Sequence, residues 1–162
     1  MSIAICYATR YGSTREVAER LAGRLAGDVR LYDLADRAPV NLSEVSAVVI
    51  GSPVFSGRVP AAVRRFIAGA REELAEREVI LYMTSLYSGA RAEAQLADNY
   101  PAWLVAHCRA KHFVGGRIRL SGLRRLDSFV LRRVGLVSED IDTISDSSID
   151  ELVSSIEQVS IG

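Results

Sequence analysis

The stretch that decides the fold is Ile3-Ala4-Ile5-Cys6-Tyr7-Ala8-Thr9-Arg10-Tyr11-Gly12-Ser13-Thr14. Its first half, residues 3–8, is an apolar run that predicts a buried strand, and residues 15–21 repeat apolar side chains at helical spacing. The hydroxyl-rich turn between them would direct N–H groups and hydroxyls at one point, where a phosphate can bind. Because Ser13 and Glu16 also fit a capping box, a capped turn without a ligand is the alternative.

The composition is that of one ordinary folded domain. The chain has 162 residues, of which 49% are hydrophobic and 25% charged, and its formal net charge is zero. This length supports one core, so we expect a single domain over residues 1–162. We find no apolar run long enough to cross a bilayer and no secretory signal, and therefore expect a cytoplasmic protein. Cys6 and Cys108 lie outside any Cys-x-x-Cys pair, which predicts small buried residues without a disulfide.

Short apolar runs rich in β-branched residues alternate with amphipathic stretches of helical length. This alternation is typical of βαβ units around a parallel sheet and places the chain in the α/β class. The expected strands are residues 3–8, 29–32, 47–50, 79–83 and 113–120. Apolar spacing predicts helices around Val17, Leu21 and Leu25, around Val63, Phe66 and Ile67, after Gly89 with an interruption at Pro101, and over residues 149–161.

Five strands with helices between them favour a three-layer sandwich, and the familiar doubly wound sheet of this length has the strand order 2-1-3-4-5. Ligands bind such sheets where the strand order reverses, outside the C-terminal ends of strands one and three. Strand one ends at the hydroxyl-rich turn, and strand three ends at residues 51–60, a loop rich in glycine, proline and serine. Both loops therefore suit a ligand.

The turn at residues 9–14 resembles the phosphate loop of the flavodoxins, Thr/Ser-x-x-Gly-x-Thr, and lacks both the lysine of a triphosphate loop and the three glycines of a dinucleotide loop. The resemblance implies a flavodoxin-like fold and non-covalently bound FMN. In that family the loops after strands three and four cover the flavin ring, so Phe55 and Tyr87 would stack on it; the alternative is that they pack on the core. The implied cofactor-binding residues are Thr9, Arg10, Tyr11, Gly12, Ser13, Thr14, Ser52, Pro53, Val54, Phe55, Ser56, Gly57, Thr84, Ser85, Leu86, Tyr87 and Gly89.

The chain departs from the electron-shuttle flavodoxins in charge and in aromatic placement. Those proteins are usually acidic and carry a tryptophan after strand three, whereas this chain is neutral and its single tryptophan, Trp103, lies elsewhere. A transient carrier gains encounter rate from an acidic rim, but Arg10 and Arg58 would bring positive charge to both candidate loops. A flavodoxin-type electron carrier is therefore the alternative to an enzyme, and a flavodoxin-fold interaction module without flavin is a second alternative.

The C-terminal third of the sequence separates its charges. Eight basic residues lie between Arg109 and Arg133 against a single acid, Asp127, and seven acids but no base follow Arg133. Within this segment an amphipathic helix is expected, with Arg125 and Arg132 opposite an apolar stripe. That helix is expected either to pack on its own domain or to contact a membrane peripherally through residues 117–134. The stripe consists of Leu123, Leu126, Val130 and Val134, and Asp127 projects close to it.

The basic segment resembles the one that follows the last strand in the flavodoxin-like, quinone-dependent protoporphyrinogen dehydrogenases. The resemblance is carried by Gly116-Arg117-Ile118-Arg119-Leu120 and by Leu126-Asp127-Ser128-Phe129, and it places a basic insertion at about residues 117–140. It implies oxidation of protoporphyrinogen IX, electron delivery to a membrane quinone, a role in heme biosynthesis and a location at the inner face of the membrane.

The basic segment also bears on partners. An arginine-rich lip suits the carboxylates of a porphyrinogen, and equally an anionic lipid or an acidic protein surface. Because aromatic residues are rare in the segment and no zinc or helix-turn-helix spacing occurs, nucleic acid is not expected. His107 and His112 lack a catalytic partner or metal spacing and are expected to be structural. No catalytic residue and no metal ligand is assigned. The sequence does not decide between a monomer and a homodimer.

Overall fold

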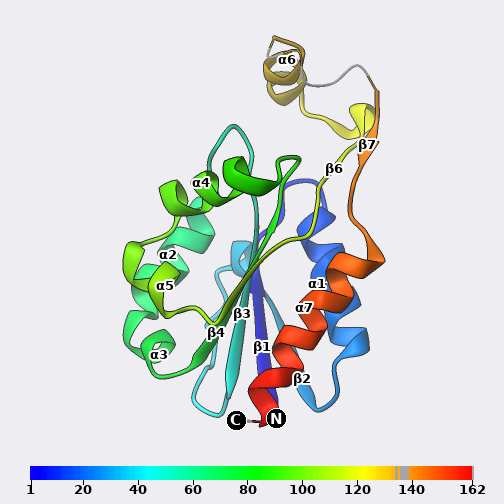
Figure 1. Ribbon diagram of the computed structural model, residues 1–162. Coiled ribbons are helices and arrows are strands. Elements are labelled where there is room, and N and C mark those ends of the chain that lie inside the picture. Colours follow the sequence, from blue (N-terminus) through cyan, green and yellow to red (C-terminus); the bar gives the residue numbers. More distant parts are fainter. Residues whose placement is uncertain (134, 136–138, 162) are drawn as a thin grey trace.

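The computed structural model describes residues 1–133, 135 and 139–161. At its centre lies a five-stranded parallel sheet whose order, β2-β1-β3-β4-β5, confirms the predicted doubly wound arrangement (Figure 1). β1 therefore pairs with both β2 and β3, and the strand order reverses beside it. The strands are β1 (Ser2–Tyr7), β2 (Asp28–Asp33), β3 (Ala47–Pro53), β4 (Glu78–Thr84) and β5 (Ala110–Phe113).

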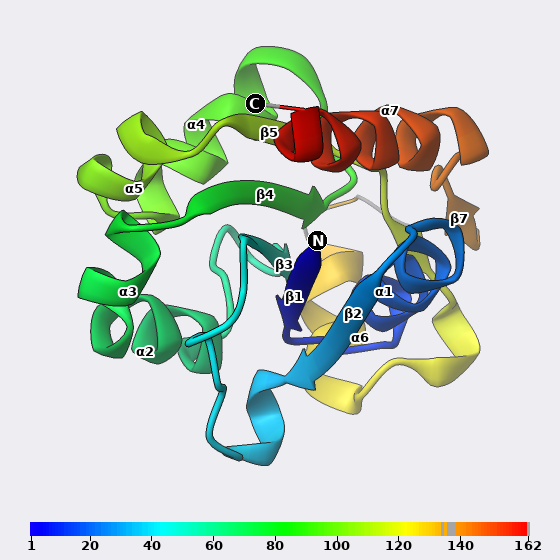
Figure 2. The same ribbon diagram turned by 90° about the horizontal axis from the view of Figure 1, so that it is seen from below.

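Helices cover both faces of the sheet and complete the expected three-layer sandwich (Figure 2). One face is covered by α1 (Ser13–Arg24) and α7 (Asp146–Glu157), which continues into the 3-10 turn η3 (Gln158–Ile161). A short 3-10 turn, η1 (Leu34–Asp36), follows β2. The opposite face is covered by α2 (Ala61–Gly69), α3 (Arg71–Ala75), α4 (Gly89–Asn99) and α5 (Ala102–His107), with the predicted break at Pro101 separating the last two.

Each face of the sheet has its own apolar core because alternate residues of a strand point to opposite faces. In β1, Ile3 and Ile5 belong to the core beneath α1 and α7, whereas Ala4 and Cys6 belong to the core on the other face. Burial raises the pKa of the Cys6 thiol to about 12, so this side chain behaves as a small apolar residue. Cys6 and Cys108 are both free thiols.

The fifth strand differs from the prediction of residues 113–120. β5 spans Ala110–Phe113 and pairs with β4 from Ile80 to Met83, and the chain then leaves the sheet at Gly115. Gly115 has φ +86°, and a Cβ there would lie 2.2 Å from the backbone oxygen of Thr143, so only glycine allows this crossing. The prediction placed this strand too late in the chain. The reason is that β5 is an edge strand of mixed polarity and lacks the apolar run that marks the central strands.

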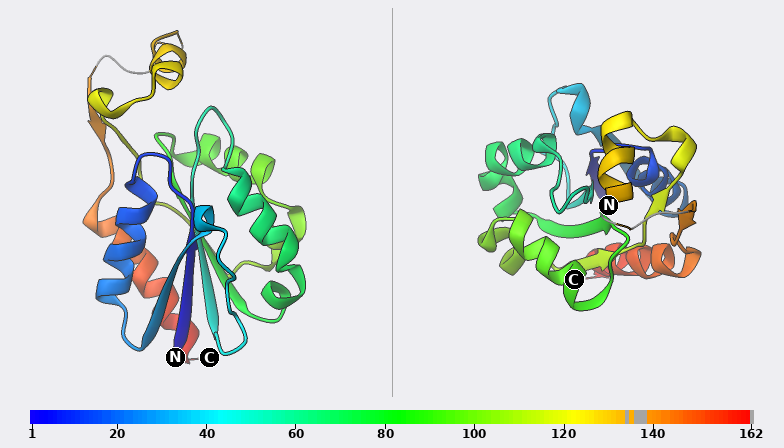
Figure 3. Two further views of the ribbon diagram at one scale, coloured as in Figure 1. Left: turned by 180° about the vertical axis from the view of Figure 1, so that it is seen from behind. Right: turned by 90° about the horizontal axis from the view of Figure 1, so that it is seen from above.

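The segment between β5 and α7 projects beyond the carboxyl ends of the strands. Here residues 117–142 are called the insertion, close to the predicted residues 117–140; Val134 of the predicted stripe lies outside the described residues. In Figure 3 its helix lies over the central strands, at the opposite end of the molecule from both termini. No helix in the described part of the chain has the length and hydropathy needed to span a bilayer. The insertion contains β6 (Arg117–Ile118), η2 (Leu120–Gly122), α6 (Arg125–Arg133) and β7 (Ile141–Asp142), with β6 and β7 paired antiparallel.

Gly51 in β3 leaves space for a tyrosine on the neighbouring strand. A Cβ at position 51 would lie 2.1 Å from the Tyr82 ring, and Tyr82 is fully buried. Its hydroxyl donates a hydrogen bond to the backbone oxygen of Thr14, at 2.9 Å, in the first turn of α1. The ring therefore cannot swing away without breaking a buried hydrogen bond.

We expect Gly51→Ala to lower the free energy of unfolding by about 3 kcal/mol, the upper part of the range for an overpacked core. The measurement is urea denaturation followed by circular dichroism. Gly23→Ala is the matched control, because Gly23 lies in α1 with no neighbouring atom within 4 Å of the added Cβ. That control should be as stable as the parent or about 1 kcal/mol more stable. Equal stability of Gly51→Ala and the parent would contradict this account.

Candidate cofactor site

The turn after β1 presents the N-terminus of α1 at the carboxyl edge of the sheet. Gly12 is the N-cap residue with φ 92°, a left-handed conformation that favours glycine, and its N–H donates to Thr9 Oγ1 at 2.9 Å. Among the described residues, no side chain caps this first turn. The Glu16 carboxylate pairs with Arg117 and Arg20 instead, so the capping-box alternative is wrong. The first N–H groups of α1 are left to bind an anion.

Thr14 connects this turn to the loop after β4. It is fully buried, and its hydroxyl lies 2.8 Å from the hydroxyl of Thr84. Both hydroxyls belong to residues that line the same cavity, so the loops after β1 and β4 meet at a polar pair. Together with the Tyr82 hydrogen bond to the Thr14 carbonyl, this contact fixes the first turn of α1 against the sheet.

A cavity of about 350 Å³ opens between the loops after β1, β3 and β4 and the insertion. Its size falls in the range of small-molecule sites, and its lining is mainly apolar with a few convergent polar groups. It lies outside the carboxyl ends of β1 and β3, where the strand order predicted a ligand. The predicted residues that line it are Thr9, Arg10, Tyr11, Ser13, Thr14, Pro53, Val54, Phe55, Ser56, Gly57, Thr84, Ser85, Leu86 and Tyr87.

Three predicted residues lie outside that lining. Ser52 is fully buried, and its hydroxyl lies 2.6 Å from that of Tyr100, so it joins β3 to the end of α4 in the core. Gly12 forms the left-handed turn and Gly89, at φ 57°, begins α4. These two glycines shape the loops whose neighbours line the cavity.

The aromatic residues of the two loops both line the cavity, each with an arginine at its ring. The Arg10 guanidinium lies 4.4 Å from the centroid of the Phe55 ring, and that of Arg91 lies 3.6 Å from the centroid of the Tyr87 ring. Cation–π attraction of this kind can orient a half-buried ring such as these two. Arg58, in contrast, is exposed and does not line the cavity.

The insertion supplies part of the lining that sequence reasoning missed. The basic segment had signalled an extra element, but nothing in the sequence placed it over the candidate loops. A Cβ on Gly116 would lie 2.9 Å from the backbone carbon of Ser85, so the insertion starts in close contact with the loop after β4. The additional lining residues are Arg91 and Gln95 from α4 and Gly116, Arg117, Ile118, Leu123, Val130 and Leu131 from the insertion and its start.

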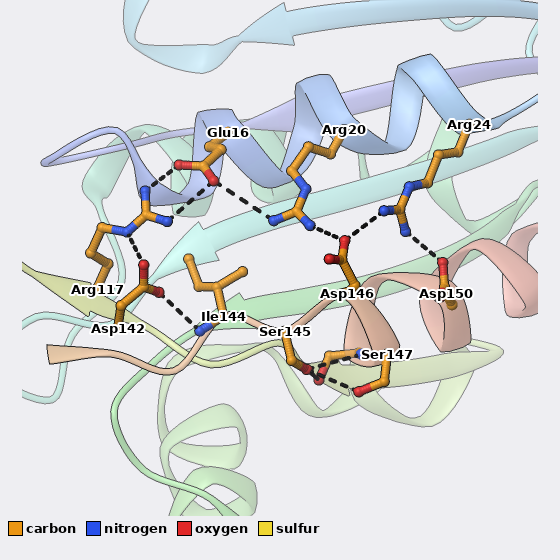
Figure 4. Close-up of polar contacts among 11 residues, drawn as sticks. Glu16, Arg20, Arg24, Arg117, Asp142, Ile144, Ser145, Asp146, Ser147 and Asp150 are labelled. Atoms are coloured by element: carbon orange, nitrogen blue, oxygen red, sulfur yellow. Dashed lines mark hydrogen bonds and ion pairs between the residues drawn. The ribbon is translucent and has the colours of Figure 1, made fainter.

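The stem of the insertion is tied to α1 by ion pairs (Figure 4). The guanidinium of Arg117 pairs with Glu16 on one side and, at 2.7 Å, with Asp142 of β7 on the other. These carboxylates raise the pKa of Arg117, chiefly through the hydrogen bond to Glu16. The same row of charges continues along α1 and α7 through Arg20, Arg24, Asp146 and Asp150.

The roof of the cavity is held by Asp127 of α6. Its carboxylate is buried and accepts hydrogen bonds from Arg10 Nε at 2.9 Å, from Arg10 Nη2 at 2.6 Å and from the Tyr11 hydroxyl. The Arg10 hydrogen bond is the main cause that lowers the pKa of Asp127. The Tyr11 hydroxyl also accepts from the N–H of Arg124 at 3.3 Å. Arg10 and Tyr11, from the turn at residues 9–14, thus hold the insertion over the cavity; these contacts with Asp127 are called the latch below.

Both histidines have structural contacts, as expected. His107 Nε2 lies 3.0 Å from the carbonyl oxygen of Leu74 and 2.9 Å from that of Arg77. His112 Nε2 lies 2.9 Å from the hydroxyl of Ser155 on α7, and burial lowers the pKa of His112. Neither residue lines the cavity.

The residues present fit FMN. The uncapped first turn of α1 and the side chains of Ser13 and Thr14 can bind its phosphate, and the apolar part of the cavity beside Phe55 and Tyr87 suits a flat ring. Backbone amides in the glycine-containing loops can meet the polar edge of that ring.

Comparison with known proteins agrees with this geometry. Residues 4–143 match the family described as Flavodoxin domain. No relative was found among curated protein sequences.

Three solved structures share the fold at low sequence identity. Oxidised flavodoxin 1 from Bacillus cereus has a TM-score of 0.55 and 14% identity, over 83% of this chain and 95% of that one. An apo NADH:FMN oxidoreductase has a TM-score of 0.59 and 13% identity, over 99% of this chain and 89% of that one. The rubredoxin oxygen:oxidoreductase of Desulfovibrio gigas has a TM-score of 0.50 and 19% identity, over 93% of this chain and 37% of that one.

We expect Asp127→Asn to loosen the roof at neutral pH, because an amide cannot replace the charge-assisted hydrogen bonds from Arg10. Since the Arg10 side chain is 37% exposed, the expected loss is about 1 kcal/mol. Amide hydrogen exchange in residues 120–133 should then be about fivefold faster. Asp98→Asn removes an equivalent charge from an exposed position on α4 and should leave that exchange unchanged.

The same latch predicts a pH dependence. The pKa of Asp127 is lower in the folded protein than in the unfolded chain, where it lies near 4. Its contribution to the stability of the latch is therefore complete above about pH 4 and is lost as the pH falls through the lower pKa of the folded protein. In the parent, protection of residues 120–133 should therefore decrease below about pH 4. If Asp127→Asn shows the same acid-dependent loss, Asp127 is not the titrating group of the latch.

Proposed function

The chain belongs to the flavodoxin domain family, and from this premise we propose that it is an FMN-dependent oxidoreductase. We propose further that its substrate is a large apolar macrocycle bearing carboxylates, of the protoporphyrinogen type, and that a quinone accepts the electrons. The observation that carries the proposal is the uncapped first turn of α1 beside the buried Thr14, at the floor of a mainly apolar cavity. FMN, when bound, supplies the two-electron redox chemistry.

The roles of the protein groups follow from their places. The loop at residues 9–14 would hold the phosphate through backbone N–H groups and hydroxyls. Phe55 and Tyr87 line the part of the cavity suited to the ring. The insertion adds Leu123, Val130 and Leu131, which would exclude water from a substrate placed above the ring.

Charge in the cavity supports a carboxylated substrate. Three arginines line it, but Arg10 is already paired with Asp127 and Arg117 with Glu16 and Asp142. Arg91 is exposed and makes no ion pair with any residue that the structure describes; its guanidinium lies over the Tyr87 ring. Arg91 is therefore the cation that can pair bidentately with a substrate carboxylate.

An electron carrier of the flavodoxin type is the second candidate. It is favoured by the similarity to flavodoxin 1 of Bacillus cereus, of which 95% is covered. A carrier exchanges electrons with protein partners at an exposed cofactor edge, whereas α6 roofs the cavity here. We therefore place the enzyme first.

Phosphate recognition can be tested by calorimetry with FMN and with riboflavin, which lacks the phosphate. We expect the parent to bind FMN much more tightly, and Ser13→Ala combined with Thr14→Val to weaken FMN binding by at least about tenfold, because hydrogen bonds to a charged group are lost. Riboflavin binding should hardly change, and Ser43→Ala in an exposed loop is the control. Absence of any FMN binding would leave only the interaction module.

The substrate class can be tested with Arg91. In the FMN-loaded protein, we expect protoporphyrinogen oxidation coupled to menaquinone reduction, and Arg91→Gln should raise KM for the porphyrinogen by about tenfold with little change in kcat. Arg64→Gln, an exposed arginine on α2, is the control. An FMN-loaded parent that reduces no quinone with this substrate, but accepts electrons from a flavodoxin reductase, would be the carrier instead.

A further inference from the structure

The helix α6 carries an apolar face that points away from the protein. Among the described residues, six large hydrophobic side chains are exposed, and three of them are Leu126, Phe129 and Val130, which are 80%, 61% and 38% exposed. Residues at positions i, i+3 and i+4 share one side of a helix, so these three form a continuous outer stripe. Among the described residues, Leu126 and Phe129 belong neither to an apolar core nor to the cavity lining.

The orientation of this stripe is fixed from the opposite side of the helix. Asp127 and Leu131, one turn apart, are both buried, the first by Arg10 and Tyr11 and the second in the lining of the cavity. Rolling α6 to bury Phe129 would pull the Asp127 carboxylate away from its two partners. The outward direction of the apolar stripe is therefore part of the folded state.

Exposed arginines lie on α6 and just before it in the chain. Arg119, Arg124, Arg125, Arg132 and Arg133 are all exposed, and the structure shows no ion pair between any of their side chains and another described residue. The Arg133 guanidinium lies 5.8 Å from the Phe129 ring centroid, at the edge of the stripe. The one acid within α6, Asp127, is neutralised by Arg10. Glu139 and Asp140 follow the helix beyond the residues of the stripe.

The position of α6 makes the stripe accessible to a flat surface. The helix is the outermost element at the end of the molecule where the strands end, and the termini lie at the far end (Figures 1 and 3). Val130 belongs both to the exposed stripe and to the cavity lining, so the rim of the cavity adjoins this surface.

We propose that α6 docks the protein reversibly on an anionic phospholipid surface. Leu126 and Phe129 would enter the boundary between headgroups and acyl chains, and the arginines would pair with lipid phosphates. A protein partner is less well matched, because a nine-residue helix is about 14 Å long and presents far less surface than a stable protein interface buries. The binding of an interfacial helix grows with its buried apolar area and with its attraction to anionic lipid, so the exposed arginines would add to what a short apolar stripe contributes. The proposal does not depend on the bound cofactor.

Sedimentation with vesicles tests the proposal directly. We expect the protein to bind vesicles of phosphatidylcholine and phosphatidylglycerol, mixed about three to one, at least about tenfold more strongly than vesicles of phosphatidylcholine alone. Binding should weaken steeply as salt is added, because the headgroup attraction is screened. Equal binding to both vesicles, or none, would overturn the proposal.

Paired variants separate the apolar and the charged contributions. Leu126→Asp with Phe129→Asp should reduce vesicle binding by at least about tenfold, whereas Leu31→Asp, at a residue 40% exposed on β2, should not. Arg125→Gln with Arg132→Gln should weaken binding more than Arg64→Gln with Arg65→Gln, which removes the same charge from α2. Unchanged urea midpoints and FMN affinities would show that the fold and the cofactor site are intact.

Sedimentation equilibrium distinguishes a second copy of the chain as the occupant. A monomer that binds anionic vesicles supports the proposal. A dimer in the parent that dissociates in Leu126→Asp with Phe129→Asp would assign the stripe to self-association and overturn it. Loss of FMN binding with vesicle binding retained would overturn the proposed function alone.

Discussion

The hydrogen bond from Tyr82 to the backbone of Thr14 fixes the geometry on which the site depends. The Tyr82 ring fills the space above Gly51, and burial raises the pKa of its hydroxyl well above the ordinary value, so the hydroxyl remains a donor. It donates from a fully buried position in β4 to the first turn of α1. The N–H groups of that turn are therefore held in place before an anion arrives, and binding need not spend free energy on ordering them.

The cavity is built from two parts that are stabilised by different forces. Its floor belongs to the sheet and rests on two apolar cores. Its roof is held mainly by charge, through Arg117 at the stem of the insertion and Asp127 on α6. Partly exposed ion pairs contribute less than a packed apolar core, so the free energy that opens the roof is smaller than the free energy that unfolds the sheet. Access to the cavity can therefore change while the phosphate loop stays formed.

The sequence predicted the features that depend on local periodicity. The alternation of apolar runs and helical stripes predicted a parallel α/β sheet, and the familiar doubly wound arrangement at this length supplied the strand order. The hydroxyl-rich turn located the N-terminus of α1. The predicted position of β5 was wrong because Lys111 and His112 interrupt its apolar run. The role of Ser52 was missed because its partner, Tyr100, is 48 residues away. Sequence reasoning also could not decide between a capping box and an open turn, since Glu16 has its partner, Arg117, in the insertion.

Asp127 shows why the faces of an amphipathic helix cannot always be assigned from its own sequence. Its position beside the apolar stripe looks like an imperfection until Arg10, 117 residues away, is brought to it. Turning α6 to bury Leu126 and Phe129 would carry Leu131 out of the cavity lining and move the Asp127 carboxylate away from Arg10 and Tyr11. Apolar burial is therefore not the only contribution to the orientation of α6. The partners of a single carboxylate, distant in the sequence, help to fix that orientation and leave Leu126 and Phe129 exposed.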